Sequence, residues 1–230
     1  MNESAVLGTV SAVWVYPVKS LAGTSVDAAE VGPSGLEGDR THSVVDVTSG
    51  EPITAREEPR LRELTASPGQ AQPIIGVPDA EIGGQVPAAA LSGWLDRPVD
   101  LAPTDAEGGH AVDAFPVHLV SEGAMLIADP EAGPEACDVN DPRANLVLKL
   151  DAEGDAERGW LGQRIQIGAA VLAITRTPKH CLGVYAEVVT PVALPPGTRY
   201  AWPTEKSTGH LRPASLSSLH RRKRRHPSTS

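Results

Sequence analysis

Aromatic residues are scarce in this sequence. Its 230 residues include one Phe and three Tyr, so the interior has to be built mainly from Val, Leu, Ile and Ala, with four Trp as the large exceptions. The 22 Gly and 21 Pro are scattered without a period, which favours many short strands joined by turns over long helices. We therefore predict a mainly β protein of the barrel type with a few short helices, formed either as one large unit or as two packed smaller ones.

Cysteine and long apolar runs are also lacking. The two cysteines, Cys137 and Cys181, cannot form the disulfide framework of a small secreted protein, and the first residues carry no basic leader. No run approaches the roughly 18 uninterrupted apolar residues that a membrane-spanning helix needs. These absences predict a cytoplasmic protein with no membrane partner.

Basic residues are few outside the C-terminal end. Residues 203–230 hold seven Lys or Arg against one Glu, which leaves thirteen against twenty-eight acidic residues in the rest of the chain. Such an acidic body argues against nucleic acid as the main partner, although the run Arg221–Arg225 is able to bind one weakly by itself. We interpret residues 203–230 as a disordered, solvated tail.

Period-two patterns and β-branched residues predict most of the secondary structure. Strands are expected at residues 6–18, 25–31, 40–46, 116–120, 145–150, 164–167, 171–176 and 183–189. Helices are expected at residues 87–95 and from Ser121 to about Asp129, before Pro130. The stretch 57–85 is irregular, and the polar segment 103–113 predicts a boundary between two halves.

Cys181 is the first candidate for chemistry. It follows Lys179 and His180 at the end of an expected strand, and neighbouring cations favour the thiolate, which is both a nucleophile and a soft metal ligand. A single cysteine in a β-rich core is more often a buried small hydrophobe, so the local pattern leaves both interpretations open. Cys137 lies in an acidic loop, whose charge disfavours a thiolate, and we interpret it as a bystander.

Polar side chains at strand ends form a second candidate group. Arginine forks match phosphate, lysine adds a point charge, and a helix start offers backbone N–H groups. Each residue taken singly is more often part of a surface ion pair, but together they predict an anion pocket. Its members are Lys19, Ser20, Arg40, Arg56, Arg60, Ser121, Arg143 and Asn145.

Several ordered motifs resemble one known family. The segments 16–20 (YPVKS), 35–40 (GLEGDR) and 54–61 (TAREEPRL) resemble the β-barrel region that precedes MOSC domains, the C-terminal domains of molybdenum-cofactor sulfurases and their relatives. The segments 115–121 (FPVHLVS), 143–147 (RANLV) and 160–168 (WLGQRIQIG), with Cys181, resemble the MOSC domain itself. The resemblance divides the chain into an N-terminal region at residues 6–102, a MOSC domain at 115–200 and the basic tail at 203–230.

The resemblance implies two intimately packed β-barrel-like regions with a molybdenum cofactor (molybdopterin) between them. Cys181 would be the protein ligand to molybdenum. Six residues match positions that hold the pterin and its phosphate in amidoxime-reducing relatives, and Arg56 lies in a matching motif of the first half. The six are Lys19, Ser20, Arg40, Ser121, Arg143 and Asn145.

The sequence also departs from the family pattern. Ala144 stands where proline is usual, and residues 182–189 replace the Thr-Thr-Val-Asp that follows the cysteine in the amidoxime-reducing type. Residues 195–198 (PPGT) replace the usual Gly-Asp turn. The chain therefore looks closer to compact bacterial MOSC proteins.

Two classes of function are compatible with these residues. The first is an oxidoreductase that reduces a small N-hydroxylated or other N–O or S–O substrate with electrons from a separate donor protein. The alternative is a sulfur-carrier or cofactor-handling protein with a persulfide on Cys181, which works with a sulfurtransferase. A cysteine hydrolase is a distant third. No pyridoxal phosphate is expected in so short a chain, and no iron–sulfur site is expected with two cysteines.

Overall fold

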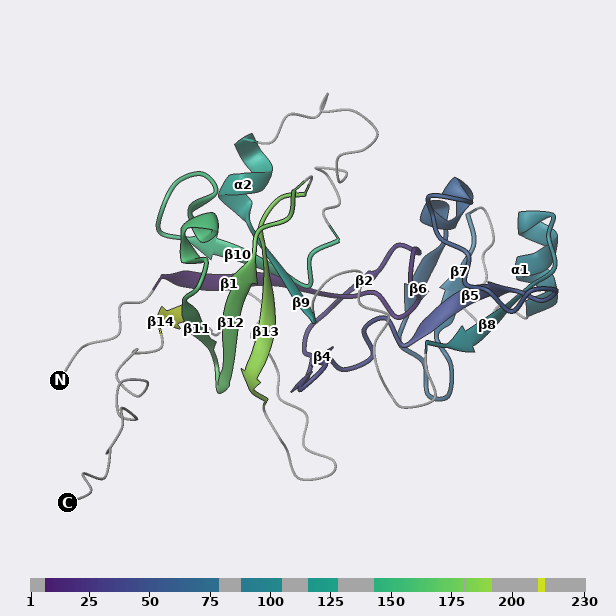
Figure 1. The fold of residues 1–230 in the computed structure, drawn as a ribbon, viewed down its shortest axis with the longest axis horizontal. Helices are drawn as coiled ribbons and strands as arrows, with labels where there is room; N and C mark the ends of the chain where they lie inside the picture. Colours follow the sequence, from purple (N-terminus) through teal and green to yellow (C-terminus); the bar gives the residue numbers. More distant parts are fainter. Residues whose placement is uncertain are drawn as a thin grey trace, which may run out of the picture.

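The computed structural model describes residues 7–78, 88–104, 116–127, 143–179 and 181–191, with backbone alone for residues 88 and 211–213. The strands and helices form two lobes that lie side by side in Figure 1. We call them the sheet lobe, which contains the eight-stranded sheet and α2, and the α1 lobe, which contains α1 and strands β5 to β8. No helix in the described part of the chain is long and apolar enough to cross a membrane.

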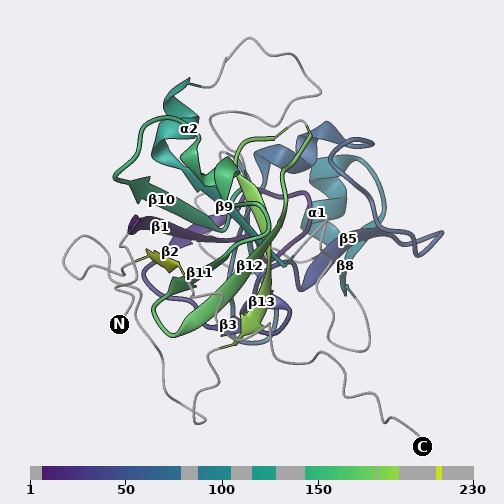
Figure 2. The same ribbon diagram turned by 60° about the vertical axis from the view of Figure 1, so that its left-hand side comes forward.

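The sheet lobe is built on one eight-stranded sheet with the order β14-β11-β12-β13-β9-β10-β1-β2. The β9–β10 pair is parallel and the other pairs are antiparallel. In Figures 1 and 2, β12 and β13 run steeply across the direction of β1, so the sheet is strongly curled. Its elements are β1 (Gly8–Val15), β2 (Thr24–Val26), β9 (Val117–Ser121), α2 (Glu122–Ile127), β10 (Leu146–Leu150), η2 (Ala156–Trp160), β11 (Arg164–Ile167), β12 (Ala170–Arg176), β13 (Val184–Thr190) and β14 (Leu211–Pro213).

The α1 lobe is assembled from short pieces. Two two-stranded ladders, β5–β8 and β6–β7, pack with α1, and a third, β3–β4, joins the sheet lobe. The pieces of the α1 lobe are β5 (His42–Asp46), η1 (Pro59–Glu63), β6 (Thr65–Ser67), β7 (Ile74–Gly76), α1 (Ala88–Leu95) and β8 (Val99–Pro103). The ladder that joins the sheet lobe consists of β3 (Val31–Gly32) and β4 (Gly35–Leu36).

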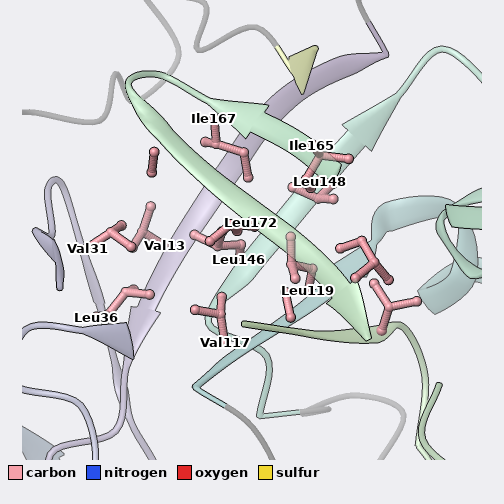
Figure 3. Packing of buried hydrophobic residues seen from close by; sticks show 14 of the residues in the cluster. Val13, Val31, Leu36, Val117, Leu119, Leu146, Leu148, Ile165, Ile167 and Leu172 are labelled. Carbon is pink, nitrogen blue, oxygen red and sulfur yellow. The ribbon is translucent and has the colours of Figure 1, made fainter. Parts of the chain in front are cut away.

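Each lobe has its own aliphatic core. In the sheet lobe, side chains from β1, β3, β4 and β9 to β13 pack between the curled strands, as Figure 3 shows for Val13, Leu36, Leu119, Leu146 and Leu172. In the α1 lobe, the core consists of Val18, Leu21, Val44, Ile53, Leu61, Leu64, Ala66, Ile75, Leu91, Leu95 and Val99. Burial of these aliphatic side chains supplies the main stabilisation of both lobes.

The first strand pairs with a strand from the second half of the chain. Gly8 pairs with Leu150 and Val13 with Leu146, and β1 then leads through Tyr16 into the α1 lobe. The two structural lobes therefore share the N-terminal residues, whereas the sequence places a single boundary at residues 103–113. That boundary itself stays a prediction, because residues 105–115 lie outside the described part of the chain.

The mainly β fold with a few short helices is confirmed. Within the tail at 203–230, Leu211–Pro213 forms β14 against β11, so the prediction of disorder is wrong for these three residues, which add main-chain hydrogen bonds to a sheet edge. The expectation that residues 57–85 are irregular misses η1 and the β6–β7 ladder. Strand β8 was not expected either.

Candidate functional site

Three distant segments of the chain meet around Tyr16. This side chain is 2% exposed, its backbone N–H donates to Asp39 Oδ1 at 2.7 Å, and its hydroxyl donates to the Ala144 carbonyl at 3.3 Å. A Cβ atom at Gly23 would come within 2.5 Å of the tyrosine ring, so a glycine is required there for the ring to keep its place. Tyr16 thus joins the YPVKS, GLEGDR and RANLV motifs.

Two arginines flank the Tyr16 ring. The guanidinium carbon of Arg40 lies 5.4 Å from the ring centroid and that of Arg143 lies 4.6 Å from it, both within cation–π range. Arg40 pairs with the Asp39 carboxylate and also approaches Asn145 Oδ1 at 3.4 Å and the Arg143 carbonyl at 3.5 Å. Arg143 donates to the Leu21 carbonyl. The structure therefore brings Arg40, Arg143 and Asn145 together beside the segment that carries Lys19 and Ser20.

The backbone is strained at three of the predicted site residues. Ser20, Arg40 and Arg143 have φ values of 72°, 52° and 53°, in the left-handed region that residues with a side chain rarely adopt. Asp96, just after α1, is the other non-glycine residue with positive φ in the described part of the chain. Strained backbone persists only where the surrounding contacts hold it in place, and it is found most often at functional sites.

Arg40 carries a buried donor without a partner. Arg40 is 6% exposed, and its Nε atom has no hydrogen-bond acceptor in the described structure. Buried polar groups are nearly always hydrogen-bonded, so a lone guanidinium donor calls for an acceptor that the protein itself does not supply. An anionic group with phosphate-like oxygens fits this donor, and the chemistry of the site therefore suits the phosphate of a pterin cofactor.

His118 on β9 connects the site to the loop that carries Cys181. Its backbone N–H donates to Asn145 Oδ1 at 3.1 Å, and its carbonyl accepts from the Asn145 backbone N–H at 2.8 Å. Its ring Nε2 lies 2.8 Å from the Leu182 carbonyl, and the ring contacts Tyr185 at a centroid distance of 4.7 Å. Because a carbonyl only accepts, Nε2 must carry the proton.

Burial keeps the His118 ring neutral. It lowers the pKa of His118 to about 4, and the positive charge of Arg40 adds to this effect, whereas the carbonyls of Leu182 and Arg143 act in the opposite direction. The imidazole is therefore a neutral hydrogen-bond donor near pH 7.

Cys181 lies in the loop between β12 and β13. Arg158 holds this loop from the η2 side, donating from Nη2 to the Pro178 carbonyl at 2.9 Å and approaching the Cys181 carbonyl at 3.5 Å. Cys181 is half-buried and is disulfide-bonded. The thiolate that the predicted ligand role requires thus exists only after this bond is reduced. His180 and Cys137 lie outside the described residues.

Ser121 and Arg56 take positions away from the Tyr16 cluster. Ser121 lies at the far end of β9 from His118, roughly 10 Å along the strand. Its backbone N–H donates to Glu157 Oε1 and its hydroxyl accepts from the Ala124 N–H, so it caps α2. Arg56 is exposed on a turn of the α1 lobe. Their cofactor-binding roles stay predictions.

Four residues that contact the site were not among the sequence candidates, namely Tyr16, Asp39, His118 and Arg158. The first three lie within the quoted YPVKS, GLEGDR and FPVHLVS motifs, so their positions were signalled even though their roles were not. Arg158 lies in a short 3-10 helix, where no periodicity marks a site. Among the described residues, no group of three or more His, Cys, Asp or Glu side chains is arranged to hold a metal ion.

Comparison with known proteins bears on the first half of the chain. Residues 7–113 match the model of the MOSC N-terminal beta barrel domain. The chain is also 46% identical to mitochondrial amidoxime reducing component 2 of Bos taurus over 59 residues, which cover 24% of this chain and 17% of that protein. Its identity to component 2 of Rattus norvegicus is 49% over 63 residues, covering 26% and 18%.

The human protein gives the same result. Mitochondrial amidoxime-reducing component 1 of Homo sapiens is 44% identical over 59 residues, which cover 24% of this chain and 17% of the relative. The match therefore spans less than a fifth of the length of these curated relatives. The likeness of residues 115–200 to a MOSC domain stays a prediction. Residues 7–113 thus match the MOSC N-terminal beta barrel domain, and over a shorter stretch the chain is similar to mitochondrial amidoxime-reducing components.

Proposed function

We propose that this protein binds a molybdenum cofactor at the Tyr16 cluster and reduces small N-hydroxylated or related N–O or S–O compounds with electrons from a separate donor protein. In this reaction the substrate takes up two electrons and two protons, the N–O or S–O bond breaks, and water leaves. The cofactor would supply the two-electron chemistry. The names of the relatives support a substrate of the amidoxime class.

The observation that carries the proposal is the buried Nε donor of Arg40. Arg40, Arg143 and the nearby Ser20 all adopt a costly backbone conformation, and such strain is found most often at functional sites. Arg40 and Arg143 would hold the phosphate of the cofactor, and Asn145 would fix the backbone between them and β9. Lys19, at the same segment, would add a positive charge.

Cys181 would be the molybdenum ligand in the reduced protein. A dithiol reductant would convert the disulfide to two thiols and would itself become the disulfide, and the Cys181 thiol would then lose its proton to give the soft ligand. Leu182 directly follows Cys181, and its carbonyl lies within hydrogen-bond distance of the His118 ring. The backbone N–H of His118 donates to Asn145 Oδ1. One residue, His118, therefore joins the candidate metal ligand to the candidate anion site.

A second candidate function rests on the same cysteine. Cys181 is half-buried and forms a sulfur–sulfur bond, which supports the proposal that its Sγ atom takes up a second sulfur. A persulfide on Cys181 would make the protein a sulfur carrier that receives sulfur from a sulfurtransferase. Both functions use Cys181, but only the first needs a retained metal.

Metal analysis of the reduced protein separates the two functions. We expect about one molybdenum atom per chain in protein produced in cells that make the cofactor, and loss of nearly all of it in Cys181→Ser. The matched control is Ser11→Cys or Ser11→Ala on the exposed face of β1, which should keep the metal. Reduction of an aromatic amidoxime with a reduced dye as donor should follow the metal content.

Two results would contradict the proposal. Full molybdenum occupancy in Cys181→Ser would remove Cys181 as the ligand. A metal-free protein that releases cyanide-reactive sulfur from Cys181 would favour the carrier function instead.

A further inference from the structure

In the loop between β12 and β13, the described residues 177–179 and 181–183 lie outside the strand ladders that pair the flanking residues. The β12–β13 ladder begins with the Arg176–Tyr185 pair, and the loop connects the two strands beyond it. At the far side, a Cβ atom at Gly183 would lie 1.9 Å from the Leu119 carbonyl, which shows that the chain there rests directly on β9. Among the described residues of this loop, the carbonyls of Pro178, Cys181 and Leu182 lie within hydrogen-bond distance of side chains.

Two side chains from different elements supply those hydrogen bonds. Arg158 on η2 donates to the Pro178 carbonyl at 2.9 Å and reaches the Cys181 carbonyl at 3.5 Å. His118 on β9 donates from Nε2 to the Leu182 carbonyl at 2.8 Å. The loop is thus held on both sides of Cys181, by donors that the chain places about forty residues apart.

His118 also holds the anion site. The backbone groups of His118 bind both the side chain and the backbone of Asn145, at 3.1 Å and 2.8 Å, and Arg40 approaches the same Asn145 oxygen at 3.4 Å. The ring also contacts the Tyr185 ring on β13. A change in the position of this imidazole would therefore move the Cys181 loop relative to Arg40 and Asn145.

We propose that His118 and Arg158 are positioning residues that hold the Cys181 loop, through its described residues 177–179 and 181–183, at a fixed place beside the Arg40–Asn145 cluster. They do so by donating hydrogen bonds to the carbonyl groups of Pro178, Cys181 and Leu182. Neither residue would touch the substrate. The inference deepens the proposed function, because the position of Sγ decides whether a cofactor bound at Arg40 reaches it.

The experiment uses the reduced full-length chain without metal, so that its result does not depend on cofactor binding. Hydrogen exchange of the peptide that contains residues 177–183 reports how often the loop opens. Alkylation of Cys181 by iodoacetamide, followed on the same peptide by mass spectrometry across a pH series, reports the environment of Sγ. The variants are His118→Leu and Arg158→Met, which remove the donors.

We expect each donor-less variant to exchange the loop amides about tenfold faster and to alkylate Cys181 several-fold faster, since one hydrogen bond of this kind is worth about a factor of ten or less in an opening equilibrium. The conservative variants His118→Gln and Arg158→Lys keep an N–H donor and should stay within about threefold of the wild type. The matched control is Arg164→Met on β11, which should leave the loop unchanged. Thermal melting would identify a variant that fails to fold.

If His118→Leu does not fold, Arg158→Met decides the outcome, because Arg158 is half-buried and lies outside the apolar cores. Loop exchange and Cys181 alkylation within about twofold of the wild type in the folded donor-less variants would overturn the inference. A wild-type protein that holds its loop but never retains molybdenum would instead overturn the proposed function. The two failures are therefore distinguishable.

Discussion

Each of two arginines lies against an aromatic ring, but Arg40 is buried at 6% exposure whereas the Arg60 side chain is 40% exposed. In the α1 lobe, Arg60 lies 5.9 Å from the Trp94 ring, pairs with Glu58 at 2.9 Å and donates to the carbonyls of Trp94 and Leu95 at the end of α1. In the sheet lobe, Arg40 has a left-handed backbone and a buried Nε atom without an acceptor.

The difference separates a structural arginine from a candidate binding residue. Arg60 closes a helix end, where unpaired carbonyls attract a cation, and Glu58 also uses its side chain to cap η1. Arg40 keeps a buried donor that has no acceptor in the described structure. The sequence groups the two residues in one candidate anion pocket, whereas their backbone conformation and their satisfied donors separate them.

Replacement of each arginine by lysine should show the largest difference between Arg40 and Arg60. Arg40→Lys keeps the charge beside Asp39 but loses the planar fork, so we expect at least a tenfold loss of retained molybdenum after buffer exchange. Arg60→Lys should leave the metal content unchanged and lower the free energy of unfolding by about 1 kcal/mol, through lost bonds to the α1 carbonyls. Metal analysis and urea unfolding measure the two effects. Equal metal loss in both variants would refute the distinction.

Glycines with the same backbone geometry should show the next largest contrast. Gly183 and Gly50 have φ values of 75° and 74°, but a Cβ atom would meet the Leu119 carbonyl at Gly183 and nothing within 4 Å at Gly50. We expect Gly50→Ala to cost about 1 kcal/mol for the left-handed backbone alone, and Gly183→Ala to cost roughly 3 kcal/mol because the chain must also shift. Urea denaturation of the two variants, compared with the wild type, tests this difference.

Acid should destabilise the sheet lobe through His118. The folded-state pKa of about 4 lies below the value of 6.5 for an unperturbed histidine, so the unfolded chain binds a proton first as the pH falls. Stability should therefore decrease between about pH 6.5 and pH 4, by at most ~3 kcal/mol for the whole window. Chemical denaturation at pH 7.5 and pH 5 measures the slope.

His118→Gln should remove most of that slope. His42→Gln in the α1 lobe should remove less, because burial lowers the pKa of His42 as well but this ring is only half-buried. An unchanged slope in His118→Gln would show that the imidazole is not the titrating group.

Relief of backbone strain should give the smallest effect. Ser20→Gly and Asp96→Gly both replace a residue with positive φ, at 72° and 51°, and each should raise the free energy of unfolding by up to about 1 kcal/mol. Only Ser20→Gly should also weaken molybdenum retention, since Ser20 lies beside the Tyr16 cluster. Thermal melting and metal analysis of the two variants would show whether strain and binding are linked in this way.

Local patterns predicted the strands of the second half well. β11 agrees with the expected residues 164–167, and β9, β10, β12 and β13 differ from expectation by one residue or so at their ends. These strands carry β-branched and aliphatic residues between clear turns. The β6–β7 ladder and β8 were missed because three- to five-residue strands with Thr, Ser, Gly or Asp give little periodicity.

Local sequence patterns could not predict which strands pair or which strand ends lie side by side. The sequence indicated that Ser121 and Asn145 both lie at strand ends, but β9 and β10 are parallel, so the two residues lie at opposite ends of the pair. That is why Asn145 joins Arg40 and Ser121 does not. The pairing of β1 with β10 likewise depends on residues far apart in the chain.

The place of β1 in the sheet has a consequence for synthesis. Because chains emerge from the ribosome N-terminus first, β1 is made early, yet its neighbour β10 is made only after the whole α1 lobe. By then the α1 lobe has all its own strands and β1 has its partner β2, so the lobe is able to fold while the other edge of β1 waits for β10. The Tyr16 cluster, which needs residues from β1's exit and from the start of β10, is therefore completed late, after the lobe on one side of it has already formed.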